Sequence, residues 1–207
     1  MHVSMIHRYN LTMTLLRFLL RAAGFFLPLT PSFAAEMTFI NMWQDGDRYH
    51  LSSESLIDAP PALVLSTLLD YENFYRISGG IKETRYVEPD TDGMPRAYTR
   101  VESCVLFFCR SIEKVERVIV VSPEEIVLDV DPKHSDFRYN HSRWQIKADG
   151  RGTRLGYDMV MEPDFWIPPL IGPWAIEKKL VSSAMTIARR LENMARTGKK
   201  LTDFNIQ

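Results

Sequence analysis

Residues 165–174 have the sequence Phe-Trp-Ile-Pro-Pro-Leu-Ile-Gly-Pro-Trp and connect two segments that differ in hydrophobic periodicity. Before this loop, residues 153–162 alternate between apolar and polar side chains, a pattern that predicts a β-strand. After it, residues 175–195 carry apolar side chains three and four positions apart, which predicts one long amphipathic helix. The apolar stripe of that helix must pack on another apolar surface, and the preceding strand offers a sheet. Helix, sheet and aromatic loop together predict an apolar pocket.

Upstream of this loop, the sequence predicts a strand, two helices and further strands joined by short turns. Expected strands cover residues 50–57, 81–88, 96–104, 109–121, 126–130 and 137–148, and expected helices cover residues 59–69 and 70–75. Turn signals such as Asp149-Gly150 separate neighbouring strands. Consecutive strands with short connections pair in an antiparallel sheet. The predicted fold class is therefore α+β, with about seven antiparallel strands and the order β-α-α-β6-α.

Two local segments carry a resemblance to a known group of proteins. They are Asp70-Tyr71-Glu72-Asn73-Phe74, after the first helix, and Pro163-Asp164-Phe165-Trp166-Ile167-Pro168-Pro169, before the last one. With the element order, they resemble the SRPBCC, or START-like, superfamily, and within it the polyketide cyclase/dehydrase and lipid-transport branch that includes coenzyme Q-binding proteins. The resemblance covers residues 48–197. It implies a helix-grip fold, in which a curved antiparallel sheet wraps around the C-terminal helix and encloses a deep apolar cavity.

The candidate ligand site follows from the last strand, the loop and the last helix. On residues 153–162 the odd-numbered side chains should face the helix, and the loop at 166–174 should control access to the cavity. The Tyr157 hydroxyl could orient a ligand while its ring packs, although core packing explains Tyr157 and the methionines equally well. The candidate ligand-binding residues are Trp144, Tyr157, Met159, Met161, Phe165, Trp166, Ile171, Trp174, Leu180 and Ala184.

Residues 1–34 are predicted to form a cleaved signal peptide. They contain three arginines and no acidic residue, an apolar run at residues 22–29, and a small-x-small site at Ser32 and Ala34. We expect cleavage after Ala34 and export to the periplasm. An uncleaved anchor is the alternative, but a membrane-spanning helix needs about 20 apolar residues, and arginines interrupt this stretch. Either Met1 or Met13 could be the first residue.

Processing leaves a mildly acidic chain of one expected domain. Residues 1–34 contain three positive charges and no negative ones, so their removal takes the formal net charge from −1 to −4. The remainder lacks the basic excess of a nucleic-acid-binding protein, and we expect no nucleic-acid partner. The expected organisation is an N-terminal lead-in at residues 35–47, the domain at residues 48–197 and a C-terminal tail at residues 198–207. The oligomeric state is left open.

Cys104 and Cys109 are the only cysteines and flank the apolar segment Val105-Leu106-Phe107-Phe108. If that segment is a hairpin loop, the cysteines face each other at about 4.5–5.5 Å, within disulfide reach. In one continuous strand they would lie about 17 Å apart. An oxidising compartment favours the disulfide, and two separate thiols are the alternative. The apolar loop either folds over the cavity mouth or contacts a membrane or partner protein.

Other chemical signals are weak. Asp129, Asp131, His134 and Asp136 cluster oxygen and imidazole groups, but their spacing matches no standard metal site and suits a solvated turn. We expect no metal and no cofactor. The favoured function is binding or transport of a hydrophobic small molecule, lipid or isoprenoid-like, without catalysis. One alternative is an aromatic cyclase/dehydratase-type enzyme, which would require a buried acid–base pair beside Tyr157. Another is an accessory module that docks on a membrane or partner.

Overall fold

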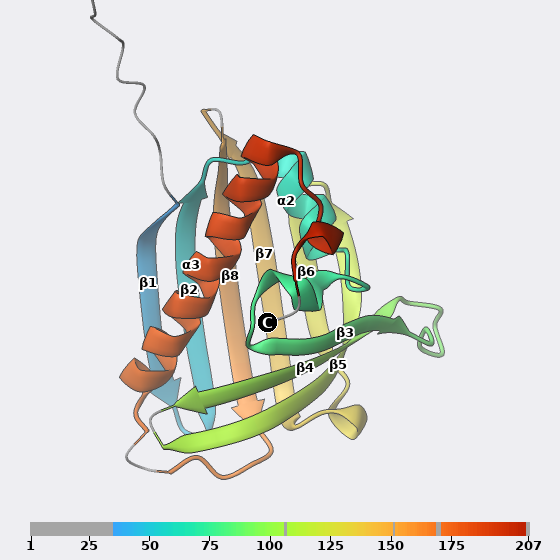
Figure 1. Cartoon of the computed structure of the whole chain (residues 1–207). Coiled ribbons are helices and arrows are strands. Elements are labelled where there is room, and N and C mark those ends of the chain that lie inside the picture. Colours follow the sequence, from blue (N-terminus) through green and yellow to red (C-terminus); the bar gives the residue numbers. More distant parts are fainter. Residues whose placement is uncertain (1–34, 106, 151, 169–170, 206–207) are drawn as a thin grey trace, which may run out of the picture. The chain divides into compact units, whose positions relative to one another are not determined.

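The computed structural model describes residues 35–205, except residues 106, 151, 169 and 170. Within these residues the chain forms one eight-stranded antiparallel sheet with the strand order β1-β2-β8-β7-β6-β5-β4-β3. The sheet curves around the long helix α3, as Figure 1 shows. The strands are β1 Glu36–Asp45, β2 Arg48–Ile57, β3 Ile81–Val87, β4 Arg96–Val105, β5 Phe108–Ser122, β6 Glu125–Val130, β7 Phe137–Asp149 and β8 Gly152–Pro163. The helices are α2 Pro61–Leu68 and α3 Pro173–Thr197, with short 3-10 helices η1 Phe74–Ile77, η2 Pro132–His134 and η3 Leu201–Asp203.

This architecture confirms the predicted α+β helix-grip fold. The strand count differs, because residues 35–47, the expected lead-in to the domain, contain the edge strand β1. β1 pairs with β2 from Glu36 opposite Leu56 to Asp45 opposite Arg48. A register shift between Met37 and Phe39 changes which positions face inward, so that Met37 before it and Ile40 after it lie on the same face although they are three positions apart. The sequence therefore lacks the simple alternation by which a half-buried strand is recognised.

Two further segments differ from the expected elements. In place of a helix at residues 70–75, the chain forms a turn and then η1, and the Asn73 amide donates to Asp70 Oδ1 at 3.0 Å. Such local side-chain bonds compete with regular helix. The tail after α3 belongs to the domain, because Leu201 is buried in the core cluster. The Arg76 guanidinium also donates to the Phe204 carbonyl at 3.1 Å.

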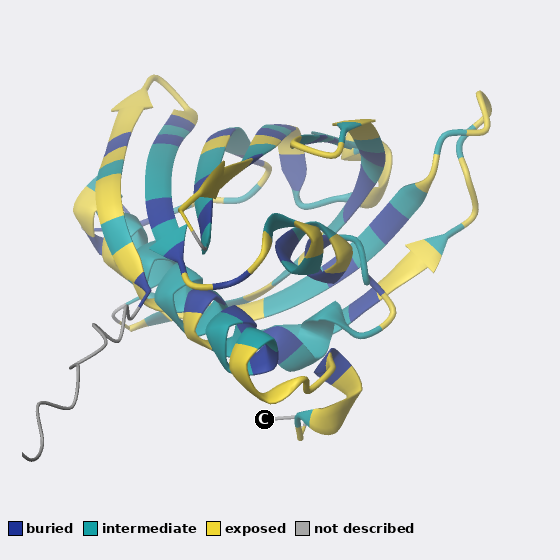
Figure 2. Ribbon diagram, turned by 90° about the horizontal axis from the view of Figure 1, so that it is seen from above, coloured by how far each residue is buried: buried dark blue, intermediate teal, exposed yellow. Residues whose placement is uncertain are grey.

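The helix α3 has two structural roles along its length. Pro173 stands at its start, where the missing N–H is not needed, and Gly198 ends it in the left-handed conformation at φ 71°. In the C-terminal half, Ala188, Leu191 and Met194 are buried in the main core against the sheet and α2. Along α3, Figure 2 shows mostly partly buried and exposed residues, and Ala175 is the one buried residue among those described in the N-terminal half. The inward side chains of that half border the cavities described below.

The β4–β5 hairpin has the geometry predicted for the cysteines. Cys104 and Cys109 are directly opposite each other in the ladder and form a disulfide. The prediction of a hairpin staple is confirmed, because the antiparallel pairing brings two residues five positions apart to one rung. The disulfide thus joins β4 to β5 at the tip of the hairpin, next to the cavity described below.

Candidate functional site

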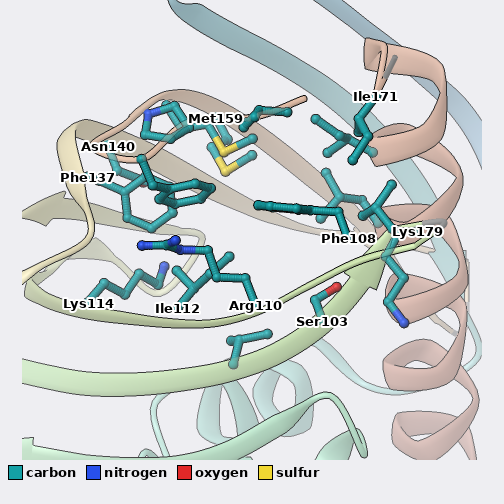
Figure 3. Close-up of a pocket in the computed structure, with 18 of the residues that line it drawn as sticks. Ser103, Phe108, Arg110, Ile112, Lys114, Phe137, Asn140, Met159, Ile171 and Lys179 are labelled. Atoms are coloured by element: carbon teal, nitrogen blue, oxygen red, sulfur yellow. The ribbon is translucent and has the colours of Figure 1, made fainter. Parts of the chain in front are cut away.

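A pocket of about 270 Å³ lies between the concave face of the sheet and the N-terminal half of α3. We name it the loop-end pocket, because the connection between β8 and α3 closes one side of it. β4, β5, β7 and β8 supply its other walls. In Figure 3, side chains from the strands and from α3 point toward this common space. Since consecutive strand residues face opposite sides, β4, β5 and β8 each contribute every second residue.

Six of the ten candidate ligand-binding residues line this pocket. They are Tyr157, Met159, Met161, Phe165, Ile171 and Leu180. The three β8 residues face α3 as their alternation predicts, and Met159 is buried. The loop supplies Phe165 and Ile171, and α3 supplies Leu180. The structure therefore brings together most of the wall expected from the sequence.

Trp144 and Ala184 line a second, smaller pocket of about 170 Å³. It lies between α3 and the part of the sheet formed by β1, β2, β7 and β8, and we name it the β1-side pocket. Tyr157 and Leu180 belong to the linings of both pockets. The sequence does not indicate two separate cavities, because the partition depends on side chains from β8 and α3 that only the fold places next to each other.

The structure places Trp166 and Trp174 outside both pockets. Their side chains are exposed, at 70% and 61% respectively. Trp166 lies between Phe165 and Ile167, which both line the loop-end pocket, but its own side chain faces solvent. Trp174 precedes the pocket residue Ile176 by two positions, which is about 200° around the helix. Both aromatic side chains therefore face outward beside the pocket and do not line it.

A buried ion pair lies on the β5 wall of the loop-end pocket. Lys114 Nζ is 2.7 Å from Glu116 Oε1, and the Glu116 side chain is only 1% exposed. Lys114 lines the pocket, and the exposed part of its side chain faces that space. Burial alone would lower the Lys114 pKa, but attraction to the Glu116 carboxylate outweighs it, and the pKa is raised. Lys114 is therefore a cation at neutral pH.

Tyr157 lies beside this pair. Its ring packs against Trp144 at a tilt of 33° with centroids 4.1 Å apart, and its hydroxyl donates to Met159 Sδ at 3.4 Å. Burial raises the Tyr157 pKa; nearby Lys114 lowers it and Glu116 raises it, and the net direction is upward. The phenol is therefore neutral at physiological pH. A group suited to acid–base catalysis has a pKa near the working pH, and both Lys114 and Tyr157 are shifted away from it.

Asn140 adds an unpartnered acceptor to the same pocket. The residue is 4% exposed, and its Oδ1 has no hydrogen-bond partner among the described residues. An unpaired buried acceptor is costly, so a bound molecule or water is expected to satisfy it. Sequence reasoning missed Lys114, Glu116 and Asn140. The available signal was that Lys114 and Glu116 occupy the same strand face as Ile112 and Val118, where a charge is unusual.

The hairpin tip folds over the mouth of the loop-end pocket. Val105 and Phe108 line the pocket, whereas Phe107 is 71% exposed; Leu106 lies outside the described residues. The Arg110 guanidinium lies 4.2 Å from the centre of the Phe165 ring and thereby links the hairpin to the β8–α3 loop. This contact places both apolar segments at one end of the molecule. These two segments form an apolar rim at the pocket mouth, in part from residues that face the pocket and in part from exposed ones.

Of the acidic cluster noted in the sequence, Asp129 and Asp131 each pair with a histidine at the surface. His141 Nδ1 lies 2.6 Å from Asp129 Oδ1, and His134 Nδ1 lies 2.9 Å from Asp131 Oδ2. Arg96 also contacts Asp131 at 3.1 Å. In the part of the chain that the structure describes, no group of three or more potential ligands could hold a metal ion.

Over the same described residues, no helix has both the length and the apolar character needed to cross a membrane.

Residues 48–198 match the model of the family described as polyketide cyclase / dehydrase and lipid transport. The chain belongs to this family. The matched segment runs from the start of β2 to the residue after α3 and includes the whole lining of the loop-end pocket, whereas Met37 and Ile40 of the β1-side pocket lie outside it. The family's description covers both chemistry and transport, so membership alone does not choose between them. A comparison with curated proteins finds no match.

Solved structures similar to this family member share its fold. A START superfamily protein from Mycobacterium smegmatis is 20% identical, with a TM-score of 0.56 over 72% of this chain and 99% of that one. A STAR-related lipid transfer protein from Xanthomonas axonopodis is 14% identical, with a TM-score of 0.53 over 76% of this chain and 99% of that one. The Zhui aromatase/cyclase from a Streptomyces species is 11% identical, with a TM-score of 0.50 over 76% and 99%. At these identities the likeness establishes the fold alone.

Proposed function

We propose that this protein binds and carries a hydrophobic small molecule, lipid or isoprenoid-like, in the loop-end pocket. The observation that carries the proposal is the pocket itself, which is enclosed by apolar side chains from four strands, a loop and α3. Transfer of apolar surface from water is favourable by about 25 cal/mol per Å², so an apolar wall can retain a ligand without any chemical step. The lipid-transfer protein with the same fold supports this choice.

The few polar groups in the pocket define one end of the proposed ligand. The Lys114 ammonium pairs with Glu116 and has further N–H groups that can donate hydrogen bonds to a ligand. Asn140 Oδ1 can accept a hydrogen bond. Both residues line the pocket. A ligand with an oxygen-bearing end would satisfy these groups while its apolar body contacts the methionine and aromatic wall. The best fit is thus an amphipathic molecule and not a pure hydrocarbon.

The proposed place of action is the periplasm. Residues 1–34, which carry the predicted signal peptide, lie outside the described residues. Two features within the described chain support export: the Cys104–Cys109 disulfide, which an oxidising compartment favours, and the start of β1 at Glu36. Cleavage after Ala34 would leave β1 intact. N-terminal sequencing of protein recovered from the periplasm tests this, and a mature chain starting within β1 would contradict it.

The experiment that tests the carrier function is native mass spectrometry of the protein purified from the periplasm without reducing agent, followed by organic extraction. We expect a complex that is heavier than the polypeptide and that releases an amphipathic lipid on extraction. A protein recovered empty, which also fails to take up lipids from a total membrane extract, would refute the carrier function.

A cyclase or dehydratase function is the second candidate, and one observation favours it. The buried Lys114–Glu116 pair lies beside Tyr157, which is the arrangement that such an enzyme would need. The raised pKa values of Lys114 and Tyr157 favour binding over proton transfer at neutral pH. Incubation with a poly-β-ketone thioester probe tests the alternative. Turnover that disappears in a Glu116→Gln variant still folded by circular dichroism would establish catalysis, and an unchanged probe would exclude this reaction.

A further inference from the structure

The β1-side pocket has no part in the function proposed above. Its wall is formed mainly by apolar side chains, and it contains no charged residue among those that the structure describes there. Met37 and Ile40 come from the edge strand β1, and Ala184 and Ile187 come from α3. The charged lining residues Arg110, Lys114 and Lys179 all belong to the loop-end pocket. The two cavities therefore differ in chemistry: one has a polar region, and the other is suited to hydrocarbon.

Two residues belong to the walls of both cavities. Tyr157 from β8 and Leu180 from α3 contribute to both linings. Both are partly buried, and the Tyr157 hydroxyl is held by a thioether sulfur, which is a weak acceptor. Side chains can change between staggered rotamers, whereas a partition of backbone could not open without moving the sheet or the helix. The partition is therefore of a kind that a ligand can displace.

The volumes of the two pockets also favour one joined site. The pockets measure about 270 Å³ and about 170 Å³. Ligand sites typically occupy about 300–1,000 Å³, so each pocket is small by itself, whereas the joined space falls within that range. A joined space that runs along α3 is elongated and not round.

We propose that the two pockets are the two ends of one elongated site, which Tyr157 and Leu180 divide when no ligand is bound. The ligand class is an amphipathic molecule with a single flexible apolar chain. This inference rests on the proposed carrier function and specifies its ligand. The polar end lies in the loop-end pocket near Lys114 and Asn140, and the chain passes Tyr157 and Leu180 into the β1-side pocket. Ala184, one turn after Leu180 on α3, limits the length of chain that fits.

The test uses decanoic and hexadecanoic acid as probes, with affinities measured by displacement of a fluorescent fatty acid from the intact protein. The variant is Ala184→Phe, which fills the β1-side pocket and does not touch the other lining. We expect wild-type protein to prefer the longer acid. The variant removes the space for the far end of the longer chain, so it should bind hexadecanoic acid about tenfold more weakly while its affinity for decanoic acid changes less than about twofold.

The matched control is Ser182→Phe, which adds the same ring at an exposed position of the same helix. It should leave both affinities unchanged. If Ala184→Phe fails to fold by circular dichroism, the smaller replacement Ala184→Leu provides the same comparison. Equal weakening of both probes, or an unchanged preference for the longer acid in a folded variant, would overturn the elongated site. Failure of wild-type protein to bind either probe would instead count against the carrier function itself.

Discussion

The Lys114 ammonium and the Glu116 carboxylate form an ion pair at 2.7 Å on the wall of a largely apolar pocket. The two residues are two positions apart on β5, so their side chains emerge on the same face of the strand. Two charges at such a site are costly to desolvate and are retained only as a pair. The pair therefore gives the pocket a polar region without giving it a net charge.

Removal of one partner should destabilise the protein strongly. In Glu116→Gln, Lys114 keeps its position but loses its counter-charge. Loss of one member of a buried pair costs about 3–5 kcal/mol, and we expect the lower end, because 20% of the Lys114 side chain is exposed. Urea unfolding measures the change. The control is Glu102→Gln, whose partner Arg100 lies at 3.0 Å on the surface and contributes about 1 kcal/mol or less. Equal losses in the two variants would contradict a buried pair.

The loss of folding stability at high pH should depend on buried groups near the same ion pair. Lys114, Tyr157 and Tyr71 all have raised pKa values in the folded chain. Burial is the largest cause of the raised Tyr71 pKa, and the nearby Glu116 carboxylate adds to it. A pKa raised on folding contributes stability that is complete below the unfolded-state pKa and is lost as the pH rises through the folded-state value. The free energy of unfolding should therefore fall above about pH 10, the ordinary pKa of tyrosine.

Absorbance at the tyrosinate band, followed with pH, measures the tyrosine contribution to this loss. We expect some tyrosines to titrate only as the protein unfolds, and Tyr157→Phe to remove part of that delayed signal. If all tyrosines of the folded protein ionise at the ordinary pKa, the buried environment assigned to Tyr157 and Tyr71 is wrong.

A charge introduced into the β8 wall should abolish ligand uptake. Met159 is buried and lines the loop-end pocket, so Met159→Lys places an unpaired ammonium among apolar groups. Met159→Leu keeps volume and polarity and should retain uptake, with a cost below about 1.5 kcal/mol in stability. Lipid content by mass spectrometry and folding by circular dichroism are measured together. A folded Met159→Lys protein with normal lipid content would show that Met159 does not line the ligand site.

Reduction of the disulfide should loosen the hairpin at the pocket mouth. The bond joins the residues immediately outside Val105 and Phe108, which both line the pocket. For so short a closed segment, chain-entropy arguments give about 2 kcal/mol of stabilisation. The intact protein should be two hydrogens lighter than the reduced form, and Cys104→Ser with Cys109→Ser should show the loss in urea unfolding. Unchanged stability would mean that strand pairing alone holds the hairpin.

The exposed aromatic residues around the mouth should favour contact with membranes. Phe107, Trp166 and Trp174 are each more than 60% exposed and flank residues that line the loop-end pocket. Indole rings partition into the membrane interface. Trp166→Ser should weaken sedimentation with anionic lipid vesicles about tenfold. Val121→Ser, at the other end of β5, is the control for an exposed apolar side chain. Equal binding by wild type and Trp166→Ser would exclude a role for this rim.

The sequence alone determined the elements whose signals are local. Periods of two and 3.6 residues identified β8 and α3, and turn residues separated the other strands, because these signals depend only on neighbouring residues. The same locality made the Cys104–Cys109 disulfide predictable, since a hairpin pairs residues that are close in the chain. Tyr157, Met159 and Met161 were placed on the correct face of β8 for the same reason.

Only the tertiary structure decided what these elements enclose. The bulge in β1 concealed an edge strand, and the outward turn of Trp166 and Trp174 depends on how the loop joins α3. The polar region joins Lys114 on β5 with Asn140 on β7, and the partition joins Tyr157 on β8 with Leu180 on α3. These residues come from different strands and from the helix. Their proximity is set by strand pairing and by the placement of the helix on the sheet, and periodicity within one segment carries no information about either.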